Sequence, residues 1–119
     1  MTNSLAIFEG YKIRRHYDEK TETWFFSVVD IVAALTDSVN PRDYWFKMKI
    51  RVKSEDGIEL STICRQLKMK APDGKMRLTD CGNVEGLLRI IQSIPSPKAE
   101  PFKRWLAKVG YERMQEMAD

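Results

Sequence analysis

The sequence predicts a single α+β domain in which a small antiparallel β structure packs against about four helices. Short runs typical of strands fill the first 26 residues, and a Pro-Asp-Gly turn joins two further runs near the middle of the chain. Elsewhere, apolar residues recur at the spacing of helix faces. With 119 residues, 43% of them hydrophobic, the chain is long enough to bury one core. We therefore expect residues 1–119 to form one domain.

The N-terminal segment predicts a small sheet. Its strands are expected at 5–8, 11–17 and 23–26, with a polar turn before the last of them. Alternation along the second strand places Arg14 and His16 on one face and Arg15 on the other, so the three cannot all serve one site. The terminal segments of the chain, 1–4 and 115–119, are expected to be loose.

A first helix is expected over 28–36. Ser27 followed three residues later by Asp30 is a capping-box pattern, which satisfies free backbone N–H groups at the start of a helix. Four apolar residues then share one face of this helix; they are Val28, Ile31, Val32 and Leu35.

A second helix is expected over 41–53. Asn40 is a favourable N-cap, and Pro41 suits the first helical position. One narrow apolar stripe on this helix can dock on the core; it consists of Trp45, Met48 and Val52. Phe46 and Ile50 lie on the side away from this stripe, which suggests a second packing partner or a groove.

The second half of the chain predicts a hairpin and two more helices. The acidic stretch 54–59 predicts a solvated loop, and the runs 66–70 and 75–79 predict the strands of a β-hairpin. The apolar residues of the two core-facing helices are Val84, Leu87, Leu88, Ile91 and Ile94, then Phe102, Trp105, Leu106 and Val109. We expect the three tryptophans of the chain in the core rather than as stacking platforms for bases.

Positive charge is concentrated in three segments of the chain. The net charge of +3 is too small to indicate a nucleic-acid partner by itself. The segments 42–53 and 65–77 each hold five cations and one anion, and 98–113 holds five cations and two anions. These segments sum to +11, and the rest of the chain to −8. Charge that is segregated in this way can form a binding patch.

The helix over 41–53 is one candidate DNA-contact element, in a helix-turn-helix-like pair with the helix before it. Arg42 and Lys49 share a helix face, so we expect them to contact base edges or nearby phosphates. The remaining cations of this helix are Lys47, Arg51 and Lys53. The connection between the two helices is longer than the tight turn of the standard motif. A basic surface helix without a ligand is the alternative interpretation.

The hairpin is the second candidate, since two-stranded ribbons can also enter a major groove. Its cations are Lys68, Lys70, Lys75 and Arg77, to which we assign the positioning of the DNA backbone. A loop of even length pairs Lys70 with Lys75 and Lys68 with Arg77, so that all four share one face. We favour this register, because a three-residue loop with a glycine bulge would mix charged and apolar faces. Lysines that protect a sheet edge are the alternative interpretation.

Other functional classes have little support. Cys64 and Cys81, with a single histidine in the chain, give no zinc-ligand spacing, and both are expected to be free thiols. Asp73-Gly74-Lys75 behind Glu59 superficially matches a metal-dependent nuclease, but Pro-Asp-Gly is better explained as turn chemistry. We expect no enzyme and no cofactor. Without a signal peptide or a long apolar run, a cytoplasmic location away from the membrane is expected.

Seven segments of the chain resemble, in order, the N-terminal domain of the BRO family, most closely the branch called DNA-damage-inducible protein D. They are IFEG at 7–10, KIRRHYDE at 12–19, WFFSVVDIV at 24–32, NPRDYW at 40–45, LKM at 67–69, RLTD at 77–80 and QSIPSPKAEPFKRWLAKVG at 92–110. The resemblance implies a non-catalytic DNA-binding module of a prophage antirepressor or a damage-response regulator. It also implies that the chain is the N-terminal part of a longer protein.

Two functional hypotheses follow from charge and resemblance together. The first is DNA binding, with duplex or single-stranded DNA left open. The alternative is a protein-interaction domain whose cationic face meets a repressor or a DNA-repair protein, and the family contains both uses. A metal-dependent nuclease is a remote third, and self-association is left open.

Overall fold

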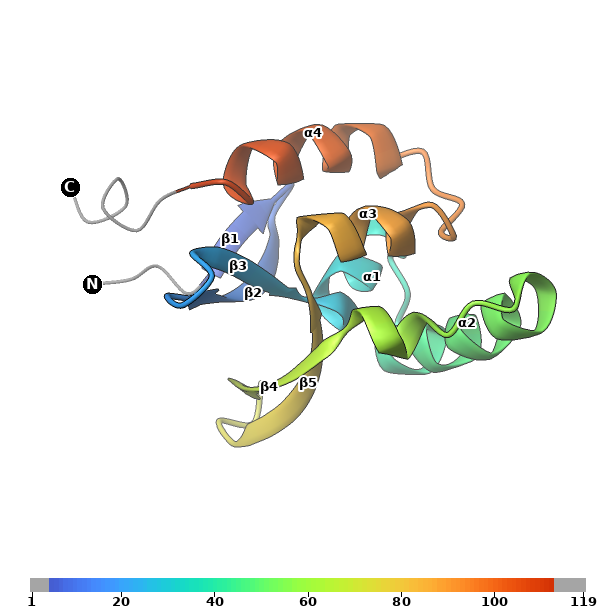
Figure 1. Cartoon of the computed structure of the whole chain (residues 1–119), viewed down its shortest axis with the longest axis horizontal. Coiled ribbons are helices and arrows are strands. Elements are labelled where there is room, and N and C mark those ends of the chain that lie inside the picture. Colours follow the sequence, from blue (N-terminus) through green and yellow to red (C-terminus); the bar gives the residue numbers. More distant parts are fainter. Residues whose placement is uncertain (1–4, 113–119) are drawn as a thin grey trace.

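The computed structural model describes residues 5–112 and confirms an α+β fold (Figure 1). Within this part of the chain, five strands form one antiparallel sheet in the order β1-β2-β3-β5-β4. The strands are β1 (Leu5–Phe8), β2 (Tyr11–Asp18), β3 (Thr23–Ser27), β4 (Arg65–Lys70) and β5 (Met76–Gly82). The helices are α1 (Val28–Thr36), α2 (Pro41–Asp56), α3 (Val84–Ile91) and α4 (Ala99–Val109), with a 3₁₀ turn, η1 (Leu60–Ile63). The termini that we expected to be loose lie outside the described residues.

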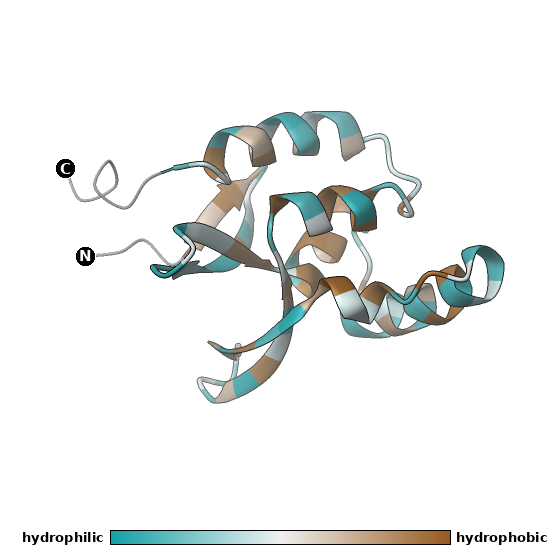
Figure 2. Cartoon of the chain, viewed as in Figure 1, coloured by the Kyte–Doolittle hydropathy of each residue, from teal (hydrophilic) through white to brown (hydrophobic). Residues whose placement is uncertain are grey.

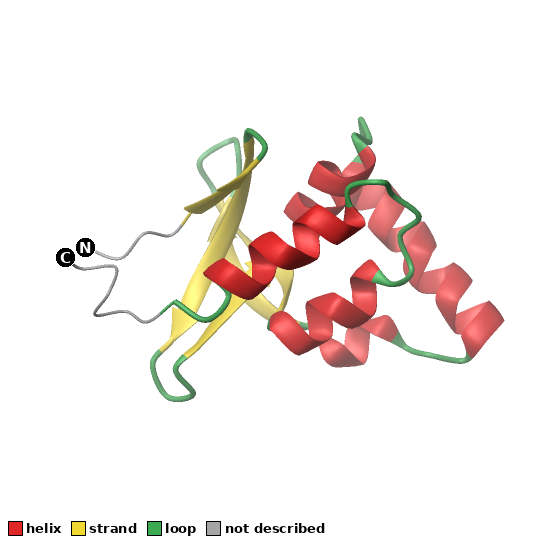
Figure 3. Ribbon diagram, turned by 90° about the horizontal axis from the view of Figure 1, so that it is seen from above, coloured by secondary structure: helices red, strands yellow, loops and turns green. Residues whose placement is uncertain are grey.

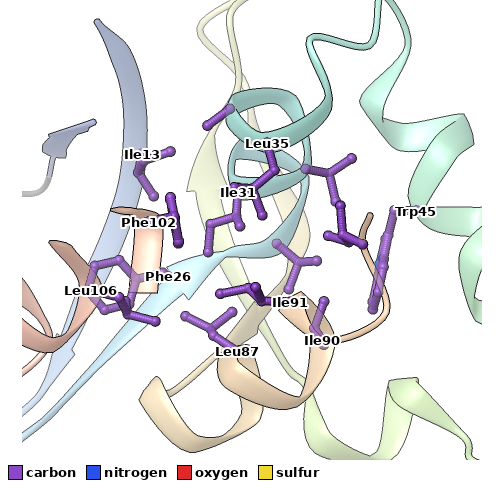
Figure 4. Close-up of a cluster of buried hydrophobic side chains, with 14 of the residues drawn as sticks. Ile13, Phe26, Ile31, Leu35, Trp45, Leu87, Ile90, Ile91, Phe102 and Leu106 are labelled. Atoms are coloured by element: carbon purple, nitrogen blue, oxygen red, sulfur yellow. The ribbon is translucent and has the colours of Figure 1, made fainter. Parts of the chain in front are cut away.

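The helices gather on one side of the sheet, and the core lies between them (Figure 3). Ile13 and Phe26 from the sheet face Phe102 and Leu106 of α4, and all four are fully buried (Figure 4). Helices α1, α2 and α3 add further large buried side chains; among them are Ile31, Trp45, Leu87, Ile90 and Ile91. Burial of this apolar surface is the main force that holds the sheet and helices together.

The helix starts follow the capping residues in the sequence. The Ser27 hydroxyl accepts a hydrogen bond from the backbone N–H of Asp30, and the Asn40 side chain accepts one from Asp43 at 3.1 Å. The predicted bounds of α1 are confirmed. Helix α2, in contrast, continues three residues beyond the predicted end, because Gly57 supplies the left-handed cap with φ of 70°. The first part of the predicted acidic loop is therefore helical, and the η1 turn after it was not predicted.

Two elements project from the core and carry the predicted DNA contacts: α2 and the β4–β5 hairpin (Figure 1). Strand β5 pairs with β3 only at its last two residues, Cys81 and Gly82. Beyond them, β4 and β5 pair only with each other in the described sheet. The hairpin is thus a two-stranded ribbon that is anchored at its base and exposed along most of its length.

Candidate nucleic-acid interface

Helix α2 divides its side chains as the sequence predicts. Trp45, Met48 and Val52 are buried in the core, whereas Phe46 and Ile50 are more than half exposed. The cations lie around the exposed faces, and four of them are exposed residues: Arg42, Lys47, Arg51 and Lys53. The helix therefore docks by one stripe and presents both charge and apolar surface to solvent.

Most of these cations already have a partner in the protein. Lys47 pairs with Asp43 at 3.0 Å, and Lys53 with Glu59 at 2.9 Å. Arg51 donates a hydrogen bond to the backbone carbonyl of Ser93 at 3.0 Å. Arg42 differs, since it makes no ion pair or hydrogen bond with any residue that the structure describes. Arg42 is thus the cation of α2 that is available to a ligand without a competing contact.

Lys49 is held by Asp80, a residue of β5 whose role the sequence analysis missed. The Asp80 carboxylate accepts hydrogen bonds from Trp45 Nε1 at 2.8 Å, Gln66 Nε2 at 3.2 Å and Lys49 Nζ at 3.4 Å. Burial opposes ionisation of Asp80, but the bonds from Trp45 and Gln66 and the charge of Lys49 outweigh it, so its pKa is lowered. Asp80 therefore ties the hairpin to α2.

The predicted register of the hairpin is wrong. Lys70 pairs with Met76, Lys68 with Leu78 and Met69 with Arg77. Pro72, Asp73 and Gly74 form a three-residue loop, closed by the bond from Ala71 N to Lys75 O at 2.8 Å and by Gly74 with φ of 86°. A glycine in this left-handed conformation is the bulge residue of such a loop, and it shifts the pairing by one residue from the even loop that we favoured.

Consequently, the four hairpin cations do not share one face. Lys68 and Lys70 lie on the same face as Leu78 and Met76, which are 61% and 60% exposed. Arg77 lies on the opposite face with Met69 and pairs with Asp73. The side chains of Lys68, Lys70 and Lys75 have no hydrogen-bonding or ionic partner among the residues that the structure describes. Figure 2 shows the resulting mixture of hydrophilic and hydrophobic residues along the ribbon.

A cleft of about 280 Å³ lies between α2 and the hairpin. Its walls combine residues of the two elements that the sequence offered as rival contact sites, among them Arg42, Phe46 and Lys49 from α2 and Arg77, Leu78 and Asp80 from β5. A second groove, of about 590 Å³, follows β4 and is lined by Lys12, His16, Lys68 and Lys70. The two hollows meet at Arg14 and at the Ala71-Pro72 end of the hairpin. The two candidate elements thus border two adjoining hollows, which contain five of the nine basic residues predicted to contact DNA: Arg42, Lys49, Lys68, Lys70 and Arg77.

The model of the BRO family N-terminal domain matches residues 12–112, which is most of the chain. This chain belongs to the BRO family. The match runs from the second residue of β2 to beyond α4 and so includes both candidate contact elements, α2 and the β4–β5 hairpin. It is a match to the family and does not assign the chain to the DNA-damage-inducible branch. Comparisons with curated proteins and with solved structures found no match.

In this BRO domain, Arg14 braces the hairpin from β2. Its Nε and Nη2 atoms donate to the two oxygens of Asp30 at 2.8 and 3.0 Å, and Nη1 donates to the carbonyl of Lys70 at 3.1 Å. The hydrogen bond to Asp30 raises the pKa of Arg14 despite partial burial. Arg15 points the opposite way, as alternation predicts, and is buried over the ring of Trp24. Of the three consecutive basic residues, only His16 is exposed.

Two of the three tryptophans of the BRO domain belong to its core, as expected, and the third, Trp105, is half-buried and packs against it. Trp24 and Trp45 are 1% and 3% exposed, and Trp105 packs against Phe8 and Phe102. The rings of Trp24 and Trp45 are therefore too buried to stack on bases.

The third basic segment is partly used within the fold. Lys98 pairs with Asp37 at 3.2 Å and lies over the ring of Tyr11. Lys103 pairs with Glu100 at 3.1 Å. Arg104 and Lys108 are exposed on α4, away from the cleft and the groove. The described residues of this segment, 98–112, line neither hollow.

The residues suggested for a nuclease are not assembled into a site. Asp73 lies in the turn and pairs with Arg77, while Glu59 pairs with Lys53. In the part of the chain that the structure describes, no three or more His, Cys, Asp or Glu residues group as metal ligands would. No helix of residues 5–112 is long and apolar enough to span a bilayer. Both cysteines are free thiols.

Proposed function

We propose that this BRO domain binds DNA, with α2 and the β4–β5 hairpin as the two parts of one contact surface. The observation that carries the proposal is the convergence of both elements on one cleft, with cations on each wall. Four cations of this surface have no partner in the described part of the protein: Arg42, Lys68, Lys70 and Lys75. Lysine and arginine at such positions neutralise phosphates and release counterions.

Two carboxylates near this surface, Asp30 and Asp80, are covered by donors of the protein. Asp30 is covered by three donors of Arg14, and Asp80 by the three donors described above. Each also has one cation of the protein beside it, Arg14 for Asp30 and Lys49 for Asp80. Membership of the BRO family supports the same function, since its N-terminal domains are associated with DNA binding in phage-type antirepressors. We extend the proposal to a cytoplasmic regulator of that type.

The test is binding to labelled duplex and single-stranded DNA of random sequence across a salt series. Four phosphate contacts give a log-log slope of about −3.6 on duplex DNA and about −2.8 on a single strand. The change Lys68→Glu with Lys70→Glu, and separately Arg42→Glu, should weaken binding severalfold or more. Arg104→Glu with Lys108→Glu on α4 is the matched control, because it removes exposed cations outside the surface. Equal losses in all three variants would contradict the proposed surface.

A protein partner is the second candidate function, and one observation favours it. Phe46 and Ile50 expose apolar surface on α2 beside the cations, as a docking site for an acidic repressor or repair protein would. If the domain binds no DNA even at low salt, this second candidate replaces the first.

A further inference from the structure

Two large apolar side chains lie on opposite walls of the α2–hairpin cleft. Phe46 on α2 is 59% exposed, and Leu78 on β5 is 61% exposed. Single exposed apolar residues are common on protein surfaces and need no explanation. Here, however, the pair flanks one hollow that also contains Arg42 and Arg77.

The fold does not use either side chain for packing. Helix α2 docks through its opposite side, and Phe46 is followed by Ile50 four residues later, on the same exposed face. Leu78 belongs to the projecting part of the ribbon, where it faces Lys68 across the strands. Packing in the core therefore does not account for an apolar residue at either position. Contact of each side chain with an apolar partner would be favourable.

We propose that this cleft binds nucleobases that are not stacked in a regular duplex, with Phe46 as the stacking surface, Leu78 on the opposite wall and Arg42 in contact with a phosphate. The inference rests on the proposed DNA binding and specifies the form of DNA. Such bases occur in single strands and at opened or mismatched steps, which share the same chemistry.

Charge complementarity selects this occupant. Arg42, which has no partner among the described residues, favours a ligand with negative charge, and Phe46 and Leu78 favour one with an apolar face. An unpaired nucleotide has both, because every base has a π-face next to a phosphate. In an intact duplex the base faces are covered by their neighbours, so contact with phosphates alone would leave Phe46 without a role.

Binding of three labelled DNAs tests the inference: a single strand, an intact duplex and the same duplex with a central mismatch. Phe46→Ala should weaken binding to the single strand about 5- to 150-fold, the range for one lost stacking contact. Binding to the mismatched duplex should weaken by a smaller factor, and binding to the intact duplex by less than about twofold. The slope of affinity with salt should stay unchanged, because stacking releases no counterions.

Two companion variants keep the test specific. Phe46→Tyr retains an aromatic ring and should bind single strands as the wild type does. Ile7→Ala removes an apolar side chain of β1 that is 53% exposed, and it should not change binding to any of the three DNAs. Thermal unfolding of each variant checks that the fold is intact. Both positions, 46 and 7, are more than half exposed, so little change in stability is expected.

The outcomes separate the inference from the proposed function. If the wild type binds all three DNAs but Phe46→Ala changes none of them, or all of them equally, the stacking role is overturned while DNA binding stands. If the wild type binds no DNA, both fail. If Phe46→Ala instead abolishes binding of an acidic amphipathic peptide and leaves DNA affinity unchanged, the cleft is a protein-docking site and the inference is overturned.

Discussion

Replacing Asp80 by alanine should both destabilise the domain and loosen the DNA-binding surface. The indole N–H of Trp45, a residue only 3% exposed, would lose its acceptor, which costs about 1–3 kcal/mol for a buried donor left unpaired. The Lys49 pair is at 3.4 Å with 29% and 16% of the two side chains exposed, and solvent screening limits it to about 0.5 kcal/mol. We expect a loss of about 2–3 kcal/mol in the free energy of unfolding.

Urea titration followed by tryptophan fluorescence measures this loss, and for a domain of this size the melting temperature should fall by about 10 °C. Glu59→Ala is the matched control, because it removes an exposed carboxylate, 51% exposed, from a surface ion pair with Lys53. That change should cost less than about 0.5 kcal/mol. Equal stability losses in the two variants would refute the role of Asp80 as the tie between α2 and the hairpin.

The pH dependence follows from the lowered pKa of Asp80. Because the folded state holds the proton less tightly than the unfolded chain, ionised Asp80 stabilises the fold above the unfolded pKa of about 3.9. This contribution is lost as the pH falls through the folded pKa. Asp80→Asn keeps an oxygen for Trp45 but has no charge to lose. The stability difference between wild type and Asp80→Asn should therefore be present at pH 7 and vanish in acid.

Three further outcomes are expected. Arg14→Ala should lower the free energy of unfolding by about 2–3 kcal/mol, measured with urea, because it breaks the partly buried ion pair with Asp30. Arg14→Lys should restore only part of this stability, and full restoration would contradict a role for the two-pronged guanidinium contact. Burial raises the pKa values of Cys64 and Cys81 to about 12, so both thiols should resist a thiol reagent at pH 8 until urea is added. Gly74→Ala should lower the free energy of unfolding in the same urea assay by about 1 kcal/mol, because Gly74 has a φ of 86°. Gly74→Asn should cost less stability, and equal losses in the two variants would argue against backbone strain at this position.

Local features of the fold could be predicted from the sequence because their causes are local. Ser27 and Asn40 cap helices where their patterns place them, and the stripe of α2 that contains Trp45 is buried. The end of α2 was missed because the acidic residues before Gly57 suit either a loop or a last helical turn. The left-handed glycine decides between them.

The hairpin register could not be predicted, for a physical reason. We chose the register that sorts charged from apolar side chains, which is the right criterion when one face of a ribbon covers a core. This ribbon projects beyond the sheet, and in the register that it adopts Met76 and Leu78 are exposed beside Lys68 and Lys70. The local preference of Pro-Asp-Gly for a three-residue loop then decides. The role of Asp80 was equally hidden, since Trp45 is 35 residues away in the sequence.

The partners of the cations change what the charge pattern means for DNA binding. Nine basic residues were assigned to the surface, and nine phosphate contacts would give a salt slope of about −8 on duplex DNA. Five of the nine are engaged by groups of the protein itself, and three of these partners are exposed carboxylates that a phosphate would have to approach: Asp43, Glu59 and Asp73. The four without partners give about −3.6 instead. A measured slope near −3.6 would mean that the protein keeps its internal ion pairs when it binds DNA. Lys49 would then support the surface through its contact with Asp80 and would not contact DNA.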